Sequence, residues 1–316
     1  MSTSNKTIRV VAAVIENAAG EILIAKRPQH LHQGGLWEFP GGKVEENEST
    51  TAALQRELLE ELNISYSNSA PLIQIHHDYP DKSVYLDVRR ITHFSGTAIG
   101  NEGQPIKWVK KADLQKFKFP AANISIINAI QLPQKYLITP EHLVSERTTF
   151  LDKLESLLMN GISLVQLRAK NLSFDEYSFL FNQVNKLTEQ YNAFLQVNTS
   201  VENAIKLGAS GIHLTSSTLM KAKSLPEDLL TSASCHNQRE IERACELGVQ
   251  FILVSPVNAT RSHPNSIPLG WQAFEKLCRY SSVPTYALGG MSSDDCITSI
   301  AHGGQGIAAI SGLWTA

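Results

Sequence analysis

The sequence lacks the features that mark a nucleic-acid-binding or membrane protein. Its 28 lysines and arginines are balanced by 30 aspartates and glutamates, so no basic surplus indicates direct DNA binding. No apolar run reaches the roughly 20 residues of a membrane-spanning helix, and residues 1–6 show no hydrophobic signal segment. We therefore expect a cytoplasmic protein that does not enter a membrane.

Cysteine is also scarce. The four cysteines all fall in the second half of the chain, and none has the C-x-x-C spacing of a zinc or redox site. Reduced thiols fit a cytoplasmic protein. With 316 residues the chain is long for one domain and suits two.

Acidic residues are concentrated in a segment that predicts a helix from about Ser49 to Leu62. Glu57, Glu60 and Glu61 stand there at positions i, i+3 and i+4, which places three carboxylates on one helical face. Such close like charges raise one another's pKa unless they are neutralised. Mg²⁺, or alternatively Mn²⁺, is a suitable partner for carboxylate oxygens. A solvated acidic face is the alternative.

The surrounding residues resemble the Nudix box, the signature of hydrolases of nucleoside diphosphates linked to a further group. The matching positions are Gly42, Glu48, Arg56, Glu57, Leu58, Glu60, Glu61 and Ile64. Asn63 stands where the family has glycine, and asparagine is the usual substitute in the left-handed conformation that follows a helix. The resemblance implies an α/β/α sandwich over residues 1–131.

Segments outside the box make residues 8–131 similar to the MutT branch, which hydrolyses 8-oxo-dGTP to the monophosphate and pyrophosphate. The resemblance implies that the metal ligands are Gly41, Glu57, Glu60 and Glu61. The implied catalytic residues are Glu57, Glu60 and Glu102, the last as base or as a further ligand. The implied nucleotide-binding residues are Arg27, His32, Glu38, Phe39, Pro40, Gly41 and Asn123. A turn at Pro40-Gly41-Gly42 is expected to bring backbone close to the metal.

Asn123 ends the run Phe-Pro-Ala-Ala-Asn, whose asparagine reads the base in MutT enzymes. Its amide can donate to O6 of 8-oxoguanine and accept from N7–H, whereas unmodified guanine presents a lone pair at N7. Such a mismatch discriminates strongly when it is buried. The alternative is that Asn123 only caps the helix that begins there.

The second half of the chain alternates apolar strand-like runs with amphipathic helical segments. The expected strands are 135–139, 163–167, 194–197, 211–214, 229–234, 251–254, 285–288 and 306–310. Eight such units favour a parallel (β/α)8 barrel of the TIM type over 135–316, with an open doubly wound sheet as the alternative. Residues 131–134 resemble a short linker. After the last strand there is no room for a full eighth helix, so another segment or a second subunit, as in a homo-oligomer, is expected to cover that flank.

This second part resembles thiamine-phosphate synthase and its relatives. The tentative ligand residues implied by the resemblance are Gln166, Arg168, Lys170, Asn198, Gly290 and Ser311, the last two in phosphate-binding loops. However, Thr199 and Thr218 stand where active synthases have aspartates that bind Mg²⁺, and His263 replaces a lysine. Losing both acids leaves a diphosphate without its metal.

Three functions therefore remain open for the whole chain. The first is an Mg²⁺-dependent 8-oxo-dGTP hydrolase that protects the nucleotide pool, with a degenerate barrel that binds a phosphorylated ligand of thiamine metabolism. The second is a bifunctional enzyme that adds thiamine-phosphate or thiazole-phosphate chemistry. The third is a Nudix hydrolase for a different nucleotide or a thiamine-pathway diphosphate. In each case the N-terminal substrate is a free phosphorylated molecule rather than a nucleic acid.

Overall fold

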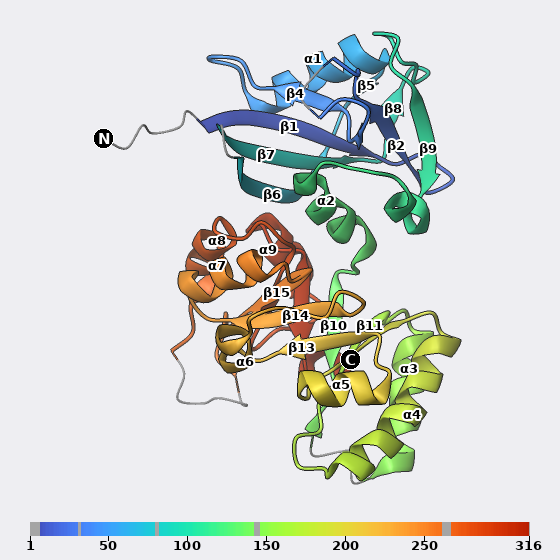
Figure 1. Cartoon of the computed structure of the whole chain (residues 1–316), viewed down its shortest axis with the longest axis vertical. Coiled ribbons are helices and arrows are strands. Elements are labelled where there is room, and N and C mark those ends of the chain that lie inside the picture. Colours follow the sequence, from blue (N-terminus) through green and yellow to red (C-terminus); the bar gives the residue numbers. More distant parts are fainter. Residues whose placement is uncertain (1–6, 31–32, 80–81, 142–145, 261–266, 316) are drawn as a thin grey trace. The chain divides into compact units, whose positions relative to one another are not determined.

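The computed structural model describes residues 7–30, 33–79, 82–141, 146–260 and 267–315. The chain divides into two compact units, residues 1–131 and 132–316. Each unit contains its own sheets and its own flanking helices (Figure 1).

The first unit is built on a mixed four-stranded sheet with the order β4-β1-β7-β6. Strand β1 runs parallel to β7 and antiparallel to β4, and β6 is antiparallel to β7. The bounds of these strands are β1 Thr7–Ile15, β4 Gly41–Lys43, β6 Ala70–Tyr79 and β7 Lys82–Ile91. The predicted turn at 40–42 is thus wrong for Gly41 and Gly42, because both pair with β1 as part of β4.

Two smaller sheets and a short helix complete the first unit. They are β3-β2-β9, formed by Trp37–Glu38, Glu21–Lys26 and Ile106–Lys110, and β5-β8, formed by Ser65–Tyr66 and Phe94–Ser95. A 3₁₀ helix, η1, covers Lys111–Lys116.

Two helices cover opposite faces of the central sheet. Because side chains alternate along a strand, Val11 and Ala13 of β1 pack with α1 (Thr50–Leu62). Ala12 and Val14 pack with α2 (Ala121–Gln131) on the other side. This arrangement confirms the predicted α/β/α sandwich.

The second unit is a closed barrel of eight parallel strands, β10 to β17 in sequence order. This confirms the barrel and rules out the open sheet. The strands are β10 Lys135–Ile138, β11 Leu164–Leu167, β12 Phe194–Val197, β13 Gly211–Leu214, β14 Leu230–Cys235, β15 Phe251–Val254, β16 Thr285–Leu288 and β17 Gly306–Ala309. Their lengths follow the short apolar runs of the sequence.

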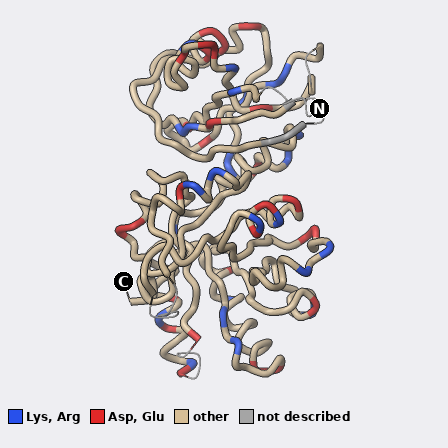
Figure 2. Tube along the Cα trace, turned by 90° about the vertical axis from the view of Figure 1, so that its left-hand side faces the viewer, with Lys and Arg blue, Asp and Glu red and all other residues tan. Residues whose placement is uncertain are grey.

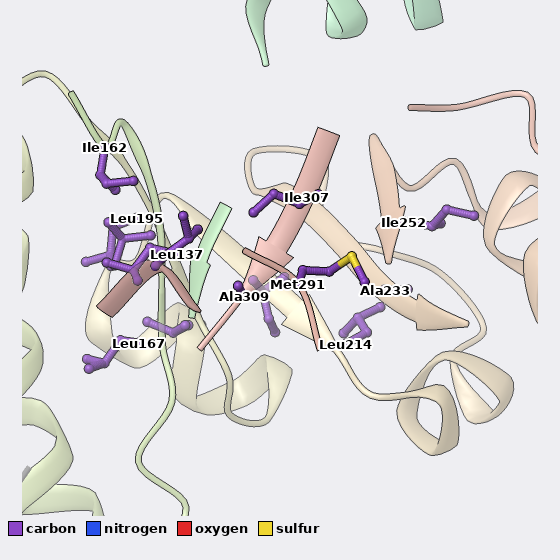
Figure 3. Close-up of a cluster of buried hydrophobic side chains, with 14 of the residues drawn as sticks. Leu137, Ile162, Leu167, Leu195, Leu214, Ala233, Ile252, Met291, Ile307 and Ala309 are labelled. Atoms are coloured by element: carbon purple, nitrogen blue, oxygen red, sulfur yellow. The ribbon is translucent and has the colours of Figure 1, made fainter. Parts of the chain in front are cut away.

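A helix follows every barrel strand. These are α3 Arg147–Met159, α4 Phe174–Gln190, α5 Val201–Leu207, α6 Ser216–Lys221, α7 Gln238–Leu247, α8 Gly270–Cys278, α9 Asp295–Ala301 and α10 Ser311–Trp314. Apolar side chains from strands and helices form the layer between them. Figure 3 shows members of this cluster on the strands, such as Leu137, Leu195 and Ile252. The last helix has only four residues, as expected, and Trp314 covers part of the flank by stacking on Phe150 of α3 at 5.1 Å between ring centroids.

The barrel interior is closed by aromatic rings and by the segment that enters the barrel. Tyr136, Phe251 and Tyr286 contact one another with ring centroids 5.5–5.8 Å apart. The expected linker, residues 131–134, is not free, because Gln305 donates to the carbonyl of Leu132 at 2.9 Å and the backbone N–H of Ile307 donates to that of Gln134 at 2.9 Å. These bonds make residues 132–134 part of the barrel unit.

No helix among the described residues has the length and apolarity needed to cross a bilayer. Acidic and basic residues are interspersed along the traced chain (Figure 2), as the balanced composition predicts.

Candidate active site

The acidic helix α1 covers Thr50–Leu62, close to the range predicted from the sequence. Ser49 caps its start, with the side-chain oxygen accepting from the backbone N–H of Ala52 at 3.2 Å. Asn63 ends it in the left-handed conformation, with φ of 55° and ψ of 37°. The asparagine thus adopts the conformation for which the Nudix box uses glycine. Leu54, Leu58 and Leu62 are buried beneath the helix and fix which face turns outward.

Strand β4 brings backbone against the carboxylates of α1. The N–H of Gly41 donates to the Glu61 carboxylate at 3.2 Å. A Cβ added to Gly42 would lie 2.2 Å from Oε1 of Glu57, and one added to Gly41 would lie 2.1 Å from the carbonyl oxygen of Val11. Only glycine fits at either position without displacing one of these groups.

A cavity of about 460 Å³ opens beside this contact. That volume lies within the range of small-molecule sites. Carboxylates reach it from three separate places: Glu38 on β3, Glu57 and Glu61 on α1, and Glu102 in the loop before β9. The other predicted residues that line the cavity are Arg27, Phe39, Gly41 and Asn123. The site is therefore assembled from segments far apart in the sequence.

Two predicted site residues lie elsewhere, and a third is outside the described residues. Glu60 does not line the cavity; its side chain is 56% exposed and lies 3.3 Å from Arg56. Pro40 is buried, and its carbonyl accepts from the N–H of Ala13 at 2.8 Å. His32 falls among the residues that the structure does not describe. On α1, therefore, the face toward the cavity carries the i, i+4 pair Glu57 and Glu61 rather than all three glutamates.

Arg56 holds the acidic groups beside the cavity in place. Its guanidinium binds both carboxylate oxygens of Glu48 at 3.0 and 3.1 Å and Oε1 of Glu57 at 2.8 Å. It also donates to the carbonyl of Lys43 at 3.2 Å. These contacts raise the pKa of Arg56, with the bond to Glu48 contributing most. Helical spacing accounts only for the weaker i, i+4 contact with Glu60, because Glu48 lies before the helix.

Two carboxyl groups inside the cavity have a raised pKa, because burial, together with neighbouring carboxylates in the case of Glu61, outweighs the groups that favour their ionisation. The pKa of Glu61 is raised to about 8, first by burial and then by the charges of Glu38, Glu57 and Glu102, against the bond from Gly41. Burial also raises the pKa of Glu38, although Arg27 pairs with it and opposes the shift. No three His, Cys, Asp or Glu side chains among the described residues form a ready-made metal cluster. Even so, uncompensated hard oxygen donors fit a divalent cation.

Asn123 is the third residue of α2, which begins at Ala121. The helix start is two residues earlier, so the alternative interpretation of Asn123 as a helix cap is wrong. Its side chain lines the cavity together with Pro120 and Ala122.

Comparison with known families identifies both units. The family model for thiamine monophosphate synthase matches residues 135–313, more than half of the chain, and the model for the NUDIX domain matches residues 11–129. The CTP pyrophosphohydrolase of Escherichia coli is 37% identical over 124 residues, 39% of this chain and 91% of the relative. This chain belongs to both families. It joins an N-terminal Nudix domain of the MutT-like kind to a C-terminal synthase-family domain.

Two further relatives represent the two domains. The 8-oxo-dGTP diphosphatase of Proteus vulgaris is 38% identical over 98 residues, 31% of this chain and 88% of the relative. The thiamine-phosphate synthase of Clostridium novyi (strain NT) is 26% identical over 182 residues, 56% of this chain and 89% of the relative.

The synthase-family domain places its tentative ligand residues at the carboxyl ends of the barrel strands or just beyond them. Gln166 on β11 donates to the hydroxyl of Tyr136 at 2.8 Å and accepts from Asn198 at 3.0 Å. Gly290 follows β16, and Ser311 begins α10. A Cβ on Gly290 would lie 2.5 Å from the carbonyl oxygen of Ala259, so backbone packing alone already requires glycine there.

The two threonines in place of acidic ligands are engaged with their own neighbours. The hydroxyl of Thr199 accepts from the Asn203 side chain at 3.3 Å, and that of Thr218 lies 2.9 Å from the hydroxyl of Thr215, the N-cap of α6. His263 lies outside the described residues. At these two strand ends the synthase-family domain offers hydroxyls, which are weaker ligands for Mg²⁺ than carboxylates.

Gln104, which the sequence analysis did not single out, connects Glu61 and Glu102 of the Nudix domain. Its side chain donates to the Glu61 carbonyl at 2.9 Å and accepts from the N–H of Glu102 at 2.9 Å. It thereby ties the loop that carries Glu102 to the end of α1, where carbonyls lack helical partners.

Replacing Gln104 by methionine removes both bonds and keeps the volume. We expect the dissociation constant for Mn²⁺ to rise about tenfold, the lower end of the effect of groups that orient metal ligands. Electron paramagnetic resonance of free Mn²⁺ measures it without a substrate. In the control Asn101→Ala, which removes a bond to the Glu60 carbonyl of 2.8 Å but none to Glu102, we expect less than a twofold change, about the scatter of such a titration. Equal effects in both variants would mean that loop anchoring in general, not Gln104, sets the affinity.

Proposed function

We propose that the Nudix domain is an Mg²⁺-dependent pyrophosphohydrolase that cleaves 8-oxo-dGTP to 8-oxo-dGMP and pyrophosphate. The observation that carries the proposal is the cavity in which carboxylates from β3, α1 and the 96–105 loop meet, with Asn123 on the same wall. Removal of an oxidised nucleotide from the pool makes mutation avoidance the biological role, and a cytoplasmic location suits it.

In this proposal, different residues of the cavity bind the metal, activate the attacking water and recognise the base. Glu57, Glu61 and the carbonyl of Gly41 are the proposed cation ligands, and Glu60 joins them by leaving Arg56. A bound cation supplies neutralisation of phosphate charge and a water of lowered pKa. Glu102 either takes the proton from the attacking water or completes the ligand set. The anhydride between the α- and β-phosphates is cleaved, with water supplying the new oxygen.

Substrate choice rests on Asn123 in this proposal, with Arg27, Glu38 and Phe39 beside it. The Asn123 amide donates to O6 and accepts from N7–H of the oxidised base. CTP is the second candidate, because the relative that hydrolyses it is as similar as the one that hydrolyses 8-oxo-dGTP, 37% against 38%. Rates on 8-oxo-dGTP, dGTP and CTP measured with the full chain test the proposal. A kcat/KM for CTP above that for 8-oxo-dGTP would reject it in favour of the second candidate.

Replacing Asn123 by alanine is expected to lower the ratio of kcat/KM for 8-oxo-dGTP over dGTP by about 10- to 100-fold, the usual size of a lost buried polar match. Steady-state kinetics on the two nucleotides measure this ratio. Ile124 is a matched control, because it is the next residue of α2, is 49% exposed and does not line the cavity. The ratio should stay unchanged in Ile124→Ala. An unchanged ratio in Asn123→Ala would remove Asn123 from base recognition.

For the synthase-family domain we propose a binding role toward a phosphorylated ligand of thiamine metabolism, without synthase turnover. The hydroxyls at Thr199 and Thr218 support this, because they replace both acidic metal ligands. A bifunctional enzyme remains the alternative. Formation of thiamine phosphate from thiazole phosphate and the pyrimidine diphosphate by the full chain decides between them, since measurable turnover would establish the alternative.

A further inference from the structure

The carboxyl end of the barrel strands carries an arginine that pairs with a carboxylate of the same chain. Arg168 follows β11, and Glu141 follows the neighbouring strand β10. The Glu141 carboxylate lies 2.8 Å from Nη1 of Arg168 through one oxygen. Its other oxygen accepts from the backbone N–H of Lys170 at 2.8 Å. The side chain of Arg168 is 27% exposed and that of Glu141 is 19% exposed, so the pair is half-buried.

The backbone around this pair is held in place. The N–H of Arg168 donates to the Thr139 hydroxyl at 2.9 Å, and Thr139 itself is completely buried. The guanidinium and the Lys170 N–H therefore project from a fixed segment at the carboxyl end of β11, the face at which such barrels bind their ligands.

A guanidinium beside a backbone N–H is a donor set that binds oxyanions, and a carboxylate and a phosphate present the same acceptor atoms to it. The Glu141 carboxylate thus stands where an anionic group of a ligand would accept these two bonds. The Arg168 guanidinium and the Lys170 N–H form a cradle that Glu141 occupies, and the paired Arg168 has no excess positive charge to offer a diphosphate. Thr199 and Thr218 have hydroxyls instead of carboxylates. They therefore do not bind a cation that would offset the repulsion between Glu141 and a diphosphate.

We propose that Glu141 is a specificity-determining residue of the barrel: it occupies the cradle formed by Arg168 and the Lys170 N–H and so excludes a ligand's diphosphate from it. This inference deepens the proposed ligand-binding role of the barrel. It limits the ligand to molecules that carry no diphosphate at the end of β11, such as a monophosphate bound elsewhere on the same barrel face.

The test is titration of inorganic pyrophosphate into the full chain by isothermal calorimetry, with a chelator present so that no cation assists binding. Glu141→Gln keeps the size of the side chain and removes its charge. We expect pyrophosphate to bind Glu141→Gln at least tenfold more tightly than the unmodified chain, since one close like charge is removed from a half-buried site. In Glu141→Gln/Arg168→Gln this gain should disappear, because the cradle has lost its cation.

Glu240 offers a matched control at another strand end. Its carboxylate accepts from the backbone N–H of His236, which follows β14, at 2.8 Å. Glu240→Gln should leave pyrophosphate affinity unchanged. An equal gain in Glu240→Gln, or a gain that survives loss of Arg168, would overturn the proposal, as would no gain in a folded Glu141→Gln.

A further variant keeps the proposal testable if Glu141→Gln does not fold. Glu141→Ala removes the same charge with a smaller side chain, so it should also bind pyrophosphate at least tenfold more tightly than the unmodified chain, and no gain in a folded Glu141→Ala would overturn the proposal. Inorganic phosphate is titrated in parallel. If none of the proteins binds phosphate, the ligand-binding role of the barrel is rejected. The pyrophosphate titrations would still decide whether Glu141 excludes a diphosphate.

Discussion

Replacing Glu61 by glutamine is expected to abolish the Mg²⁺-dependent hydrolysis of 8-oxo-dGTP, with kcat/KM falling by roughly 10³-fold or more. Glutamine keeps the shape of the side chain and its bond from Gly41, but it removes the charge that would hold the cation between β4 and α1. Loss of several kcal/mol of charge stabilisation corresponds to this factor. Pyrophosphate release followed against Mg²⁺ concentration measures it. Turnover near that of the unmodified chain would refute the proposed metal site.

The stability of the same variant is an independent control for its folding. In the presence of a chelator, the raised pKa of Glu61, about 8 and thus above its ordinary value of 4.5, means that ionisation disfavours the folded state. The penalty is absent below pH 4.5, grows as pH rises to about 8 and is constant above. Each pKa unit corresponds to about 1.4 kcal/mol. Allowing for movement of the carboxylate toward solvent, we expect Glu61→Gln to be more stable by about 1–3 kcal/mol at pH 8.

Thermal unfolding across that pH range provides the measurement. The difference in stability between Glu61→Gln and the unmodified chain should vanish near pH 4.5 and reach its maximum above pH 8. A variant that is inactive but less stable at every pH would indicate a packing defect, and its loss of activity would then say nothing about metal binding.

The second large effect is expected at Gly42. An added methyl group would lie 2.2–2.5 Å from all three carboxyl atoms of Glu57, so alanine must push that carboxylate away from the cavity. A displacement of about 1 Å in a catalytic group costs roughly 10²-fold in rate. We therefore expect kcat to fall by about that factor in Gly42→Ala. Steady-state hydrolysis of 8-oxo-dGTP at saturating Mg²⁺ tests this.

A double-mutant cycle separates this steric effect from general damage. Glu57→Asp shortens the side chain and withdraws its carboxylate from position 42. If the clash is the cause, adding Gly42→Ala to Glu57→Asp should lower the rate much less than adding it to the unmodified chain. Additive losses would show that alanine at position 42 acts on something other than Glu57.

Local patterns were sufficient to predict helix α1, its end at Asn63 and the eight strands of the barrel. Each depends on neighbours in sequence: the leucine stripe of α1 repeats every four residues, and residue 63 needs only to tolerate the left-handed conformation. The order of the barrel strands followed as well, because each parallel connection requires a helix and eight units close a sheet. The same reasoning placed Glu57, Glu60 and Glu61 along one helix, but it did not decide which of them turns toward the cavity.

The contacts between charged residues far apart in the sequence were set only by the tertiary structure. Arg56 contacts Glu48, Glu57 and Glu60, and Glu60 lies outside the cavity. Burial raises the pKa of Glu61, and the charges of Glu38 and Glu102, which come from other segments, raise it further. In the barrel, the parallel pairing of β10 with β11 brings Glu141 and Arg168 together, although they are 27 positions apart in the sequence. The sequence by itself determined the elements and the families, since periodicity and motifs are local. Only the folded chain decided which charges meet, because electrostatic partners are chosen by distance in space.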